Sequence, residues 1–180
     1  MSPVGDLEGG VWTVDPGYSS ITFKIRHLGM RDYRAGFRDV HGTLDAEAGT
    51  LELSVQLDNL DLSQPDIRER LLSAEFLDAA GYPRVQFVSS GLVADEGSRD
   101  VTVPGNLTIH GVTRPVQGAG RIGIPGPHLL TGKEQITFEL AATIDRREFG
   151  IAWQEELPEG GLTLSNEVTL EAVLELALDA

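Results

Sequence analysis

The chain has 180 residues and a mass of 19.4 kDa, which suits a single domain. It carries 14 basic and 28 acidic residues, and a surface with a net charge of −14 repels nucleic-acid phosphates and anionic bilayers. The sequence contains no cysteine, so disulfides, thiolate metal ligands and thiol nucleophiles are excluded.

The first ten residues, MSPVGDLEGG, show no periodic pattern. We expect a flexible N-terminal tail at residues 1–10 and one folded domain at residues 11–180. The tail lacks the basic and apolar stretches of a secretory signal, and no later stretch has the roughly 18 apolar residues of a spanning helix. These features predict a cytoplasmic protein without stable membrane insertion.

Alternation of apolar and polar residues runs through most of the domain and predicts antiparallel strands with one buried face. Three segments show the alternation most clearly: residues 20–27, 135–144 and 166–178. Further strands are expected at residues 51–62, 84–87 and 106–110, weaker ones at 33–44 and 116–124, and a short opening strand at 12–15. The pattern therefore predicts an all-β domain of about eight strands.

One short helix is predicted near residues 64–80. Ser63 is placed to cap it, Pro65 falls in its first turn, and Gly81 follows its last turns. Amphipathic strands with one helix suit either a sandwich or a closed barrel. Long strands, and glycines within the weaker ones, favour an antiparallel eight-stranded barrel, whose interior can hold one small ligand.

Known catalytic and metal-binding patterns are missing from the sequence. It has no G-x-S-x-G elbow and no glycine-rich phosphate loop between a strand and a helix. The four histidines, His27, His41, His110 and His128, form no closely spaced ligand pair. Period two places His27 on the apolar face of residues 20–27, either as a hydrogen-bonded core residue or as a contact to the polar end of a ligand.

Arg146 and Arg147 stand together at the end of a predicted strand, in an otherwise acidic chain. Two interpretations stay open for them. The guanidinium groups either hold an anionic head group through bidentate hydrogen bonds, or pair with Asp145 and Glu148 to fix a corner. Arg146 and His27 are therefore the candidates for polar contacts to a ligand.

Five motifs, in order, resemble those of the YceI-like proteins, a polyisoprenoid-binding family with a lipocalin-like barrel. Residues 12–27 resemble the family's opening W-x-x-D-x-x-x-S-x-I-x-F-x-I-x-H, and residues 105–116 (GNLTIHGVTRPV) resemble its hairpin G-x-L-T-I-x-G-V-T-x-P-V. The other motifs are GF at 36–37, SAEFLD followed by YPRVQF within 73–87, and DRREFGI at 145–151. The resemblance covers nearly all of residues 11–178.

This resemblance implies an extended antiparallel eight-stranded lipocalin-like barrel, with a helix over one opening and a long apolar lumen. Members of the family bind long-tailed amphiphiles such as polyprenyl phosphates, isoprenoid quinones or fatty amides, and they are often dimers. The chain departs from the family on the helix, where R-D-x-H is usual and Ile67, Arg68, Glu69 and Arg70 stand instead. A ligand contact from that histidine in relatives would be made differently here.

Residue patterns and resemblance together predict a non-catalytic protein that binds or carries a long-chain isoprenoid or acyl lipid in the barrel lumen. We expect no cofactor, metal or nucleic-acid partner, and we expect a homodimer from the resemblance. Two alternatives stay open: an enzyme that uses the lumen as a substrate tunnel, or a filled barrel that acts as a stress-linked interaction module. The predicted lumen residues are Ile21, Phe23, Ile25, His27, Phe37, Leu53, Val55, Phe87, Leu107, Ile109, Phe138, Leu140 and Phe149, with His27 and Arg146 at the head group.

Overall fold

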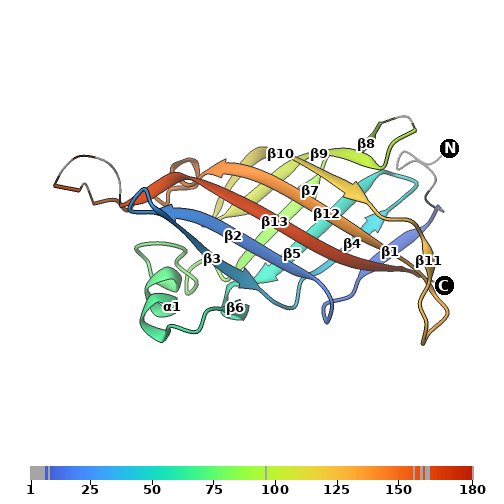
Figure 1. Cartoon of the computed structure of the whole chain (residues 1–180), viewed down its shortest axis with the longest axis horizontal. Coiled ribbons are helices and arrows are strands. Elements are labelled where there is room, and N and C mark those ends of the chain that lie inside the picture. Colours follow the sequence, from blue (N-terminus) through green and yellow to red (C-terminus); the bar gives the residue numbers. More distant parts are fainter. Residues whose placement is uncertain are drawn as a thin grey trace.

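The structure is a computed structural model that describes residue 7 and residues 9–95, 97–155, 157–158, 160 and 163–179. Its strands form one sheet that closes into an antiparallel eight-stranded barrel (Figure 1), which confirms the barrel that the long strands, the glycines and the family resemblance favoured over a sandwich. The strands are β1 (Val11–Val14), β2 (Ser20–His27), β3 (Arg31–Phe37), β4 (His41–Asp45), β5 (Thr50–Gln56), β6 (Leu60–Asp61), β7 (Arg84–Ser89), β8 (Val93–Ala94), β9 (Asp100–Ile109), β10 (Val112–Ile122), β11 (Gly126–Pro127), β12 (Glu134–Asp145) and β13 (Leu164–Leu178). The helices are η1 (Leu57–Asn59), α1 (Pro65–Leu72) and η2 (Arg146–Phe149).

The thirteen segments make eight barrel strands because five of the barrel strands are interrupted and consist of two segments each, namely β1 with β2, β3 with β4, β5 with β6, β7 with β8, and β10 with β11. β1 and β2 lie end to end as one barrel strand, which pairs with a second strand made of β3 and β4. β5 and β6 make a third strand, which pairs with the other edge of β3 and β4. The order then continues from β5 through β7, β9, β10 and β12. β13 closes the ring, since it pairs with β12 along one edge and with β1 and β2 along the other.

The pairing of β12 with β13 shows how the sequence sets the register. Phe138 lies opposite Leu174, and Ile144 lies opposite Val168, so apolar side chains meet on the inner face. The intervening Glu139 is exposed on the outer face. A shift of one residue would turn every apolar side chain toward solvent, and burial of one face therefore fixes the register.

The helix α1 is shorter than the segment predicted near residues 64–80. The predicted cap was wrong: Gln64 is the N-cap residue and makes no side-chain capping hydrogen bond. Pro65 sets this boundary, because the residue before a proline favours extended backbone, and Gln64 has φ −88° and ψ 105°. Beyond Leu72 the chain continues in turns as far as Gly81.

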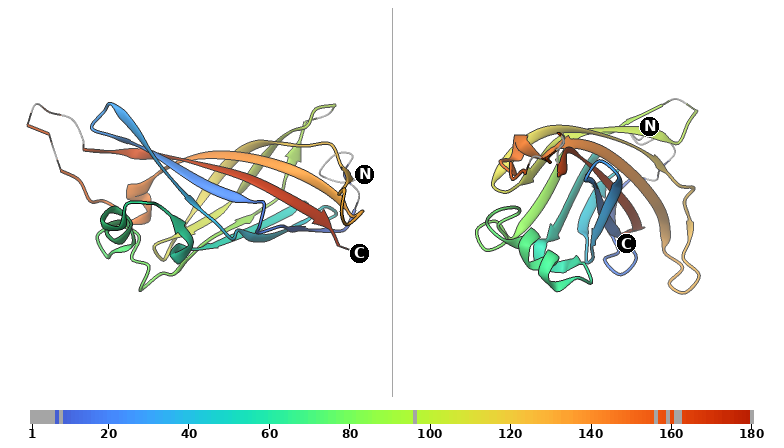
Figure 2. Two further views of the ribbon diagram at one scale, coloured as in Figure 1. Left: turned by 60° about the horizontal axis from the view of Figure 1, so that its bottom comes forward. Right: turned by 60° about the vertical axis from the view of Figure 1, so that its left-hand side comes forward.

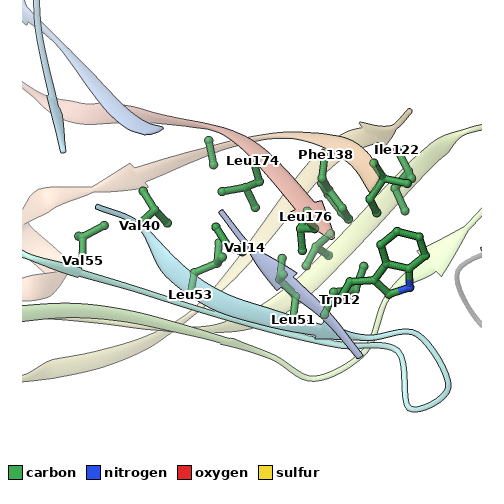
Figure 3. Packing of buried hydrophobic residues seen from close by; sticks show 14 of the residues in the cluster. Trp12, Val14, Val40, Leu51, Leu53, Val55, Ile122, Phe138, Leu174 and Leu176 are labelled. Atoms are coloured by element: carbon green, nitrogen blue, oxygen red, sulfur yellow. The ribbon is translucent and has the colours of Figure 1, made fainter. Parts of the chain in front are cut away.

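Close packing fills the half of the barrel in which β1 begins and β13 ends, which we call the filled half. Trp12, Phe138 and Leu174 are fully excluded from solvent there, and their side chains point into the space enclosed by the strands (Figure 3). Leu176 and Leu51 are equally inaccessible and lie beside them. Tight packing of this kind supplies the main hydrophobic stabilisation of the fold.

The flexible tail predicted at residues 1–10 falls largely outside the described residues. Where the chain is described, Leu7 is buried in the core of the filled half, and the carbonyl of Gly10 accepts a hydrogen bond from the Ala46 amide at 2.9 Å. At these positions the chain packs on the barrel instead of lying loose. Within the described part of the chain, no helix is long and apolar enough to cross a membrane.

Candidate functional site

The half of the barrel next to α1 is hollow, and we call it the open half. It encloses a cavity of about 540 Å³, within the range of roughly 300–1,000 Å³ that is usual for small-molecule sites. The wall is almost wholly apolar and is formed by strands on opposite sides of the barrel, including β2, β5, β9 and β12. The alternative of a barrel filled throughout its length is therefore wrong.

Most of the predicted lumen residues line this cavity. They are Ile21, Phe23, Ile25, His27, Phe37, Leu53, Val55, Phe87, Leu107, Ile109 and Leu140. Phe138 and Phe149 lie outside the lining. Phe138 faces inward like Leu140 but sits two residues further into the filled half, and Phe149 belongs to η2, where it packs against other buried side chains with 1% exposure.

The helix α1 lies at the opening of the cavity, at the end brought forward in Figure 2 (right). Its residues Ile67 and Leu71 contribute to the cavity lining, although no residue of the helix is fully buried. Arg68 fastens the helix to the barrel wall: its Nε donates to the Leu60 carbonyl at 3.1 Å and its Nη2 to the Asp58 carbonyl at 2.7 Å. α1 therefore forms part of the rim of the opening.

Arg70 stands on α1 where the family resemblance leads one to expect a histidine, and the sequence analysis gave it no role. It lines the cavity, and its guanidinium carbon lies 4.8 Å from the ring centroid of Trp153 and 5.9 Å from that of Phe76. Its Nε also lies 3.4 Å from a carboxylate oxygen of Glu75. These contacts, with the Phe76–Trp153 ring contact at 5.4 Å, join α1 to the segment after η2 across the rim.

Arg146 is the buried cation of the cavity, with 4% of its surface exposed. Its Nε donates to the Ser165 carbonyl at 2.9 Å, and its Nη1 donates to the carbonyls of Ile151 at 2.9 Å and Trp153 at 2.7 Å. Gly150, with φ 76°, ends η2 in the left-handed conformation that turns the chain back toward Arg146. Among the described buried side chains, Nη2 of Arg146 is the nitrogen or oxygen left without a hydrogen-bond partner.

The two neighbouring arginines have different surroundings, and Arg147 makes the corner ion pair that one of the two interpretations predicted. Arg147 points outward and pairs with Asp145, with Nη2 2.6 Å from Oδ2. That hydrogen bond is the main reason why the pKa of Asp145 is lowered. Burial lowers the pKa of Arg146, the charge of Asp145 opposes this change and that of Arg147 adds to it. A guanidinium keeps its proton even so, and Arg146 places a positive charge against the apolar cavity.

His27 lines the cavity near its opening, at the end of β2, and is partly buried. The other histidines have local roles or stand outside the cavity. His110 Nδ1 lies 3.2 Å from the Phe149 carbonyl, and His128 Nδ1 accepts hydrogen bonds from two backbone amides of its own turn. His41 is exposed on β4. In the described ranges, no group of three or more His, Asp or Glu side chains is arranged to hold a metal ion.

A closed antiparallel barrel with an apolar cavity inside and a helix at the opening defines a lipocalin-like barrel. The model of the YceI-like domain matches residues 12–176. The chain therefore belongs to the YceI-like family.

Relatives support the same assignment. The chain is 30% identical over 161 residues to a UPF0312 protein of Pseudomonas syringae pv. tomato, covering 87% of this chain and 81% of that protein. It is 29% identical over 139 residues to Protein YceI of Salmonella paratyphi B, covering 74% and 71% of the two chains.

Solved structures show the same fold at lower sequence identity. BcnA of Burkholderia cenocepacia matches with a TM-score of 0.73 and 21% identity, covering 90% of this chain and 98% of BcnA. A polyisoprenoid binding domain from Saccharophagus degradans matches with a TM-score of 0.69 and 15% identity, covering 93% and 98%. The barrel architecture is thus shared across sequences that have diverged widely.

Proposed function

We propose that this protein binds a long-chain amphiphile in the open half of the barrel and carries or sequesters it without chemical change. The tail lies along the apolar wall, and the polar head group accepts a hydrogen bond from Arg146. A polyisoprenoid or an isoprenoid quinone is the favoured class, because one solved structure with the same fold is a polyisoprenoid binding domain.

The observation that carries the proposal is the unpartnered Nη2 of Arg146 beside an apolar cavity. A buried charge with an unsatisfied donor is costly, and the neighbouring carboxylate of Asp145 is already paired with Arg147. Nη2 is itself enclosed, so an oxygen of a ligand, whether phosphate, carboxylate or quinone carbonyl, would satisfy this donor once a small shift of the Arg146 side chain brings it to the cavity surface. Charge-assisted hydrogen bonds of this kind are about twice as strong as neutral ones.

The wall supplies affinity for the tail, and the head group supplies selectivity. Each buried methylene contributes about 0.8 kcal/mol, so a long tail binds well to a wall such as Phe23, Leu107 and Leu140. An apolar wall distinguishes tails of neighbouring lengths poorly. We therefore assign the choice of ligand mainly to Arg146, with His27 and Arg70 as polar groups nearer the opening.

Native mass spectrometry of protein purified without detergent tests this proposal. We expect a bound lipid at a ratio near one to one, released and identified after solvent extraction. The control is Ala142→Phe, which places a ring in the cavity that Ala142 lines and should leave the protein folded but empty. Circular dichroism checks that the fold is retained, and Leu107→Trp provides a second filling variant.

Two results would overturn the proposal. One is a wild-type protein that is empty as purified and also fails to take up either a polyprenyl phosphate or an isoprenoid quinone. The other is a folded Ala142→Phe variant that retains as much lipid as the wild type, because the lipid would then be bound outside the cavity.

A further inference from the structure

The hairpin formed by β2, β3 and their turn has a charge opposite to that of the rest of the molecule. It carries Lys24, Arg26, Arg31 and Arg34 against one acidic residue, Asp32, in a chain with twice as many acidic as basic residues. Asp32 lies 3.5 Å from Arg26. No described residue forms an ion pair with the other three basic side chains. The repulsion of anionic surfaces predicted from net charge therefore does not hold for this hairpin.

Two of these charges face each other across the strands. Lys24 and Arg34 are directly opposite in the register of β2 and β3, on the outer face of the barrel. Like charges in this position destabilise a sheet, because their side chains are close neighbours. An anion bound from outside the chain would remove this repulsion.

The turn of the hairpin exposes apolar side chains. Met30 is 87% exposed and Leu28 is 43% exposed, between the basic residues of the two strands. Leu28 has φ 57° and Gly29 has φ 67°. Two successive positive φ angles favour Asn-Gly or Gly-Gly, and a leucine in the left-handed region costs roughly 1–2 kcal/mol. The chain thus presents a leucine where local backbone preference opposes it.

The position of the hairpin connects it to the cavity. His27 and Tyr33, on the inner face of β2 and β3, line the cavity next to the turn. The turn and α1 lie at the same end of the barrel (Figure 1). A flat surface in contact with Leu28 and Met30 would therefore lie against the open end of the barrel, where the cavity opens.

We propose that the β2–β3 hairpin docks the open end of the barrel on an anionic lipid bilayer, with Leu28 and Met30 entering the headgroup region and the basic side chains contacting lipid phosphates. Apolar side chains flanked by basic ones are the usual composition of segments that lie in a membrane interface. The contact is peripheral, since only a turn enters the headgroup layer. It gives the cavity access to membrane lipids, and to that extent rests on the proposed function.

Flotation of the protein with vesicles tests the docking. Wild-type protein with its ligand removed should float with vesicles of phosphatidylcholine and phosphatidylglycerol, and much less with phosphatidylcholine alone. Added salt should weaken the binding because it screens the basic side chains. Lys24→Gln with Arg34→Gln should lower the partition coefficient by roughly an order of magnitude, and Leu28→Asn with Met30→Ser by about fivefold.

The opposite end of the barrel offers a matched control. Leu129 and Leu130, in the turn between β11 and β12, are 99% and 90% exposed, and Lys133 lies beside them. The variant Leu129→Ser, Leu130→Ser, Lys133→Gln should float like the wild type. Asn suits the left-handed backbone at position 28 better than Leu does, so we expect the Leu28→Asn, Met30→Ser variant to stay folded, and its thermal unfolding checks this.

The proposal fails if wild-type protein does not float with anionic vesicles, if the control variant loses as much binding as the hairpin variants, or if salt-sensitive self-association replaces vesicle binding in sedimentation. The lipid content of protein purified without detergent reports on the cavity separately. A protein that carries lipid but ignores vesicles would overturn the docking and leave the proposed function intact.

Discussion

In the filled half of the barrel, Trp12, Phe138 and Leu174 point into the lumen from the neighbouring strands β1, β12 and β13 and are fully excluded from solvent. In the open half, the same strands carry inward side chains that leave a cavity of about 540 Å³. Both halves show the same alternation along β12 and β13, so the facing of side chains does not distinguish them. The two halves differ in the size of the side chains that point into the lumen.

Small residues contribute to the hollow region. Ala142, Ala172 and Gly118 line the cavity, whereas inward positions of the same strands β12 and β13 in the filled half carry larger side chains such as Phe138 and Leu176. The filled half therefore provides the stability of the fold, and the open half gives up some close packing to hold a ligand. This division predicts that equivalent substitutions have unequal effects in the two halves.

The largest effect is expected from Leu174→Ala compared with Leu170→Ala on the same strand. Leu174 is fully buried in the filled half, whereas Leu170 is partly buried and lines the cavity. Truncation in a packed core should cost about 2–5 kcal/mol because it leaves a new void. Truncation at an existing cavity should cost less than half as much, since fewer contacts are lost. Chemical unfolding of ligand-free protein measures both values, and equal losses would contradict the division.

A smaller effect is expected when volume is added. Val14→Phe in the filled half, where Val14 is 2% exposed, should cost about 1–3 kcal/mol through overpacking. Ala142→Phe should leave the unfolding free energy of the ligand-free protein nearly unchanged, because its ring enters the cavity. Thermal unfolding of the two variants decides the matter. A strongly destabilised Ala142→Phe would mean that the open half has no room for the ring.

How far the sequence predicts the structure can be judged at Leu140 and Phe138. Period two placed both on the inner face, and both do face inward, but only Leu140 lines the cavity. Alternation predicts whether a side chain points into the barrel. It does not predict whether inward side chains of other strands will contact that side chain. The position of the cavity along the barrel depends on such contacts, and therefore had to come from the structure.

Arg146 illustrates the same limit for the candidate site. Its place in the DRREFGI motif singled it out, and its position beside Arg147 left the tasks of the two arginines open. Burial of one and exposure of the other follow from η2, which turns Arg146 toward the carbonyls of Ile151 and Trp153. The sequence contained a signal for Arg70 as well, in its departure from the family's helix motif, but not its contacts with Trp153.

The smallest effect is expected at the exposed ion pair between Arg147 and Asp145. Because Arg147 lowers the pKa of Asp145, the pair stabilises the fold at pH values above the unfolded-state pKa of Asp145, and this contribution disappears as the pH falls through the lowered folded-state pKa. Arg147→Gln should therefore lower the unfolding midpoint slightly at pH 7, and this deficit should shrink as the pH falls below about 3.9, the ordinary pKa of an aspartate, and vanish once Asp145 is protonated in the folded state. A deficit that grows on acidification would contradict the assignment of this pair.

Titration of ligand-free protein with a polyprenyl phosphate, and separately with the polyprenol of the same tail, tests the central claim most directly. We predict that the wild type binds the phosphate at least about tenfold more tightly, because a charge-assisted hydrogen bond from Arg146 adds roughly 1.5–3 kcal/mol. Arg146→Met, which keeps an apolar side chain in the cavity wall, should bind both with the affinity of the alcohol. A wild type that does not distinguish the two ligands, or a preference for phosphate that survives in Arg146→Met, would contradict the account.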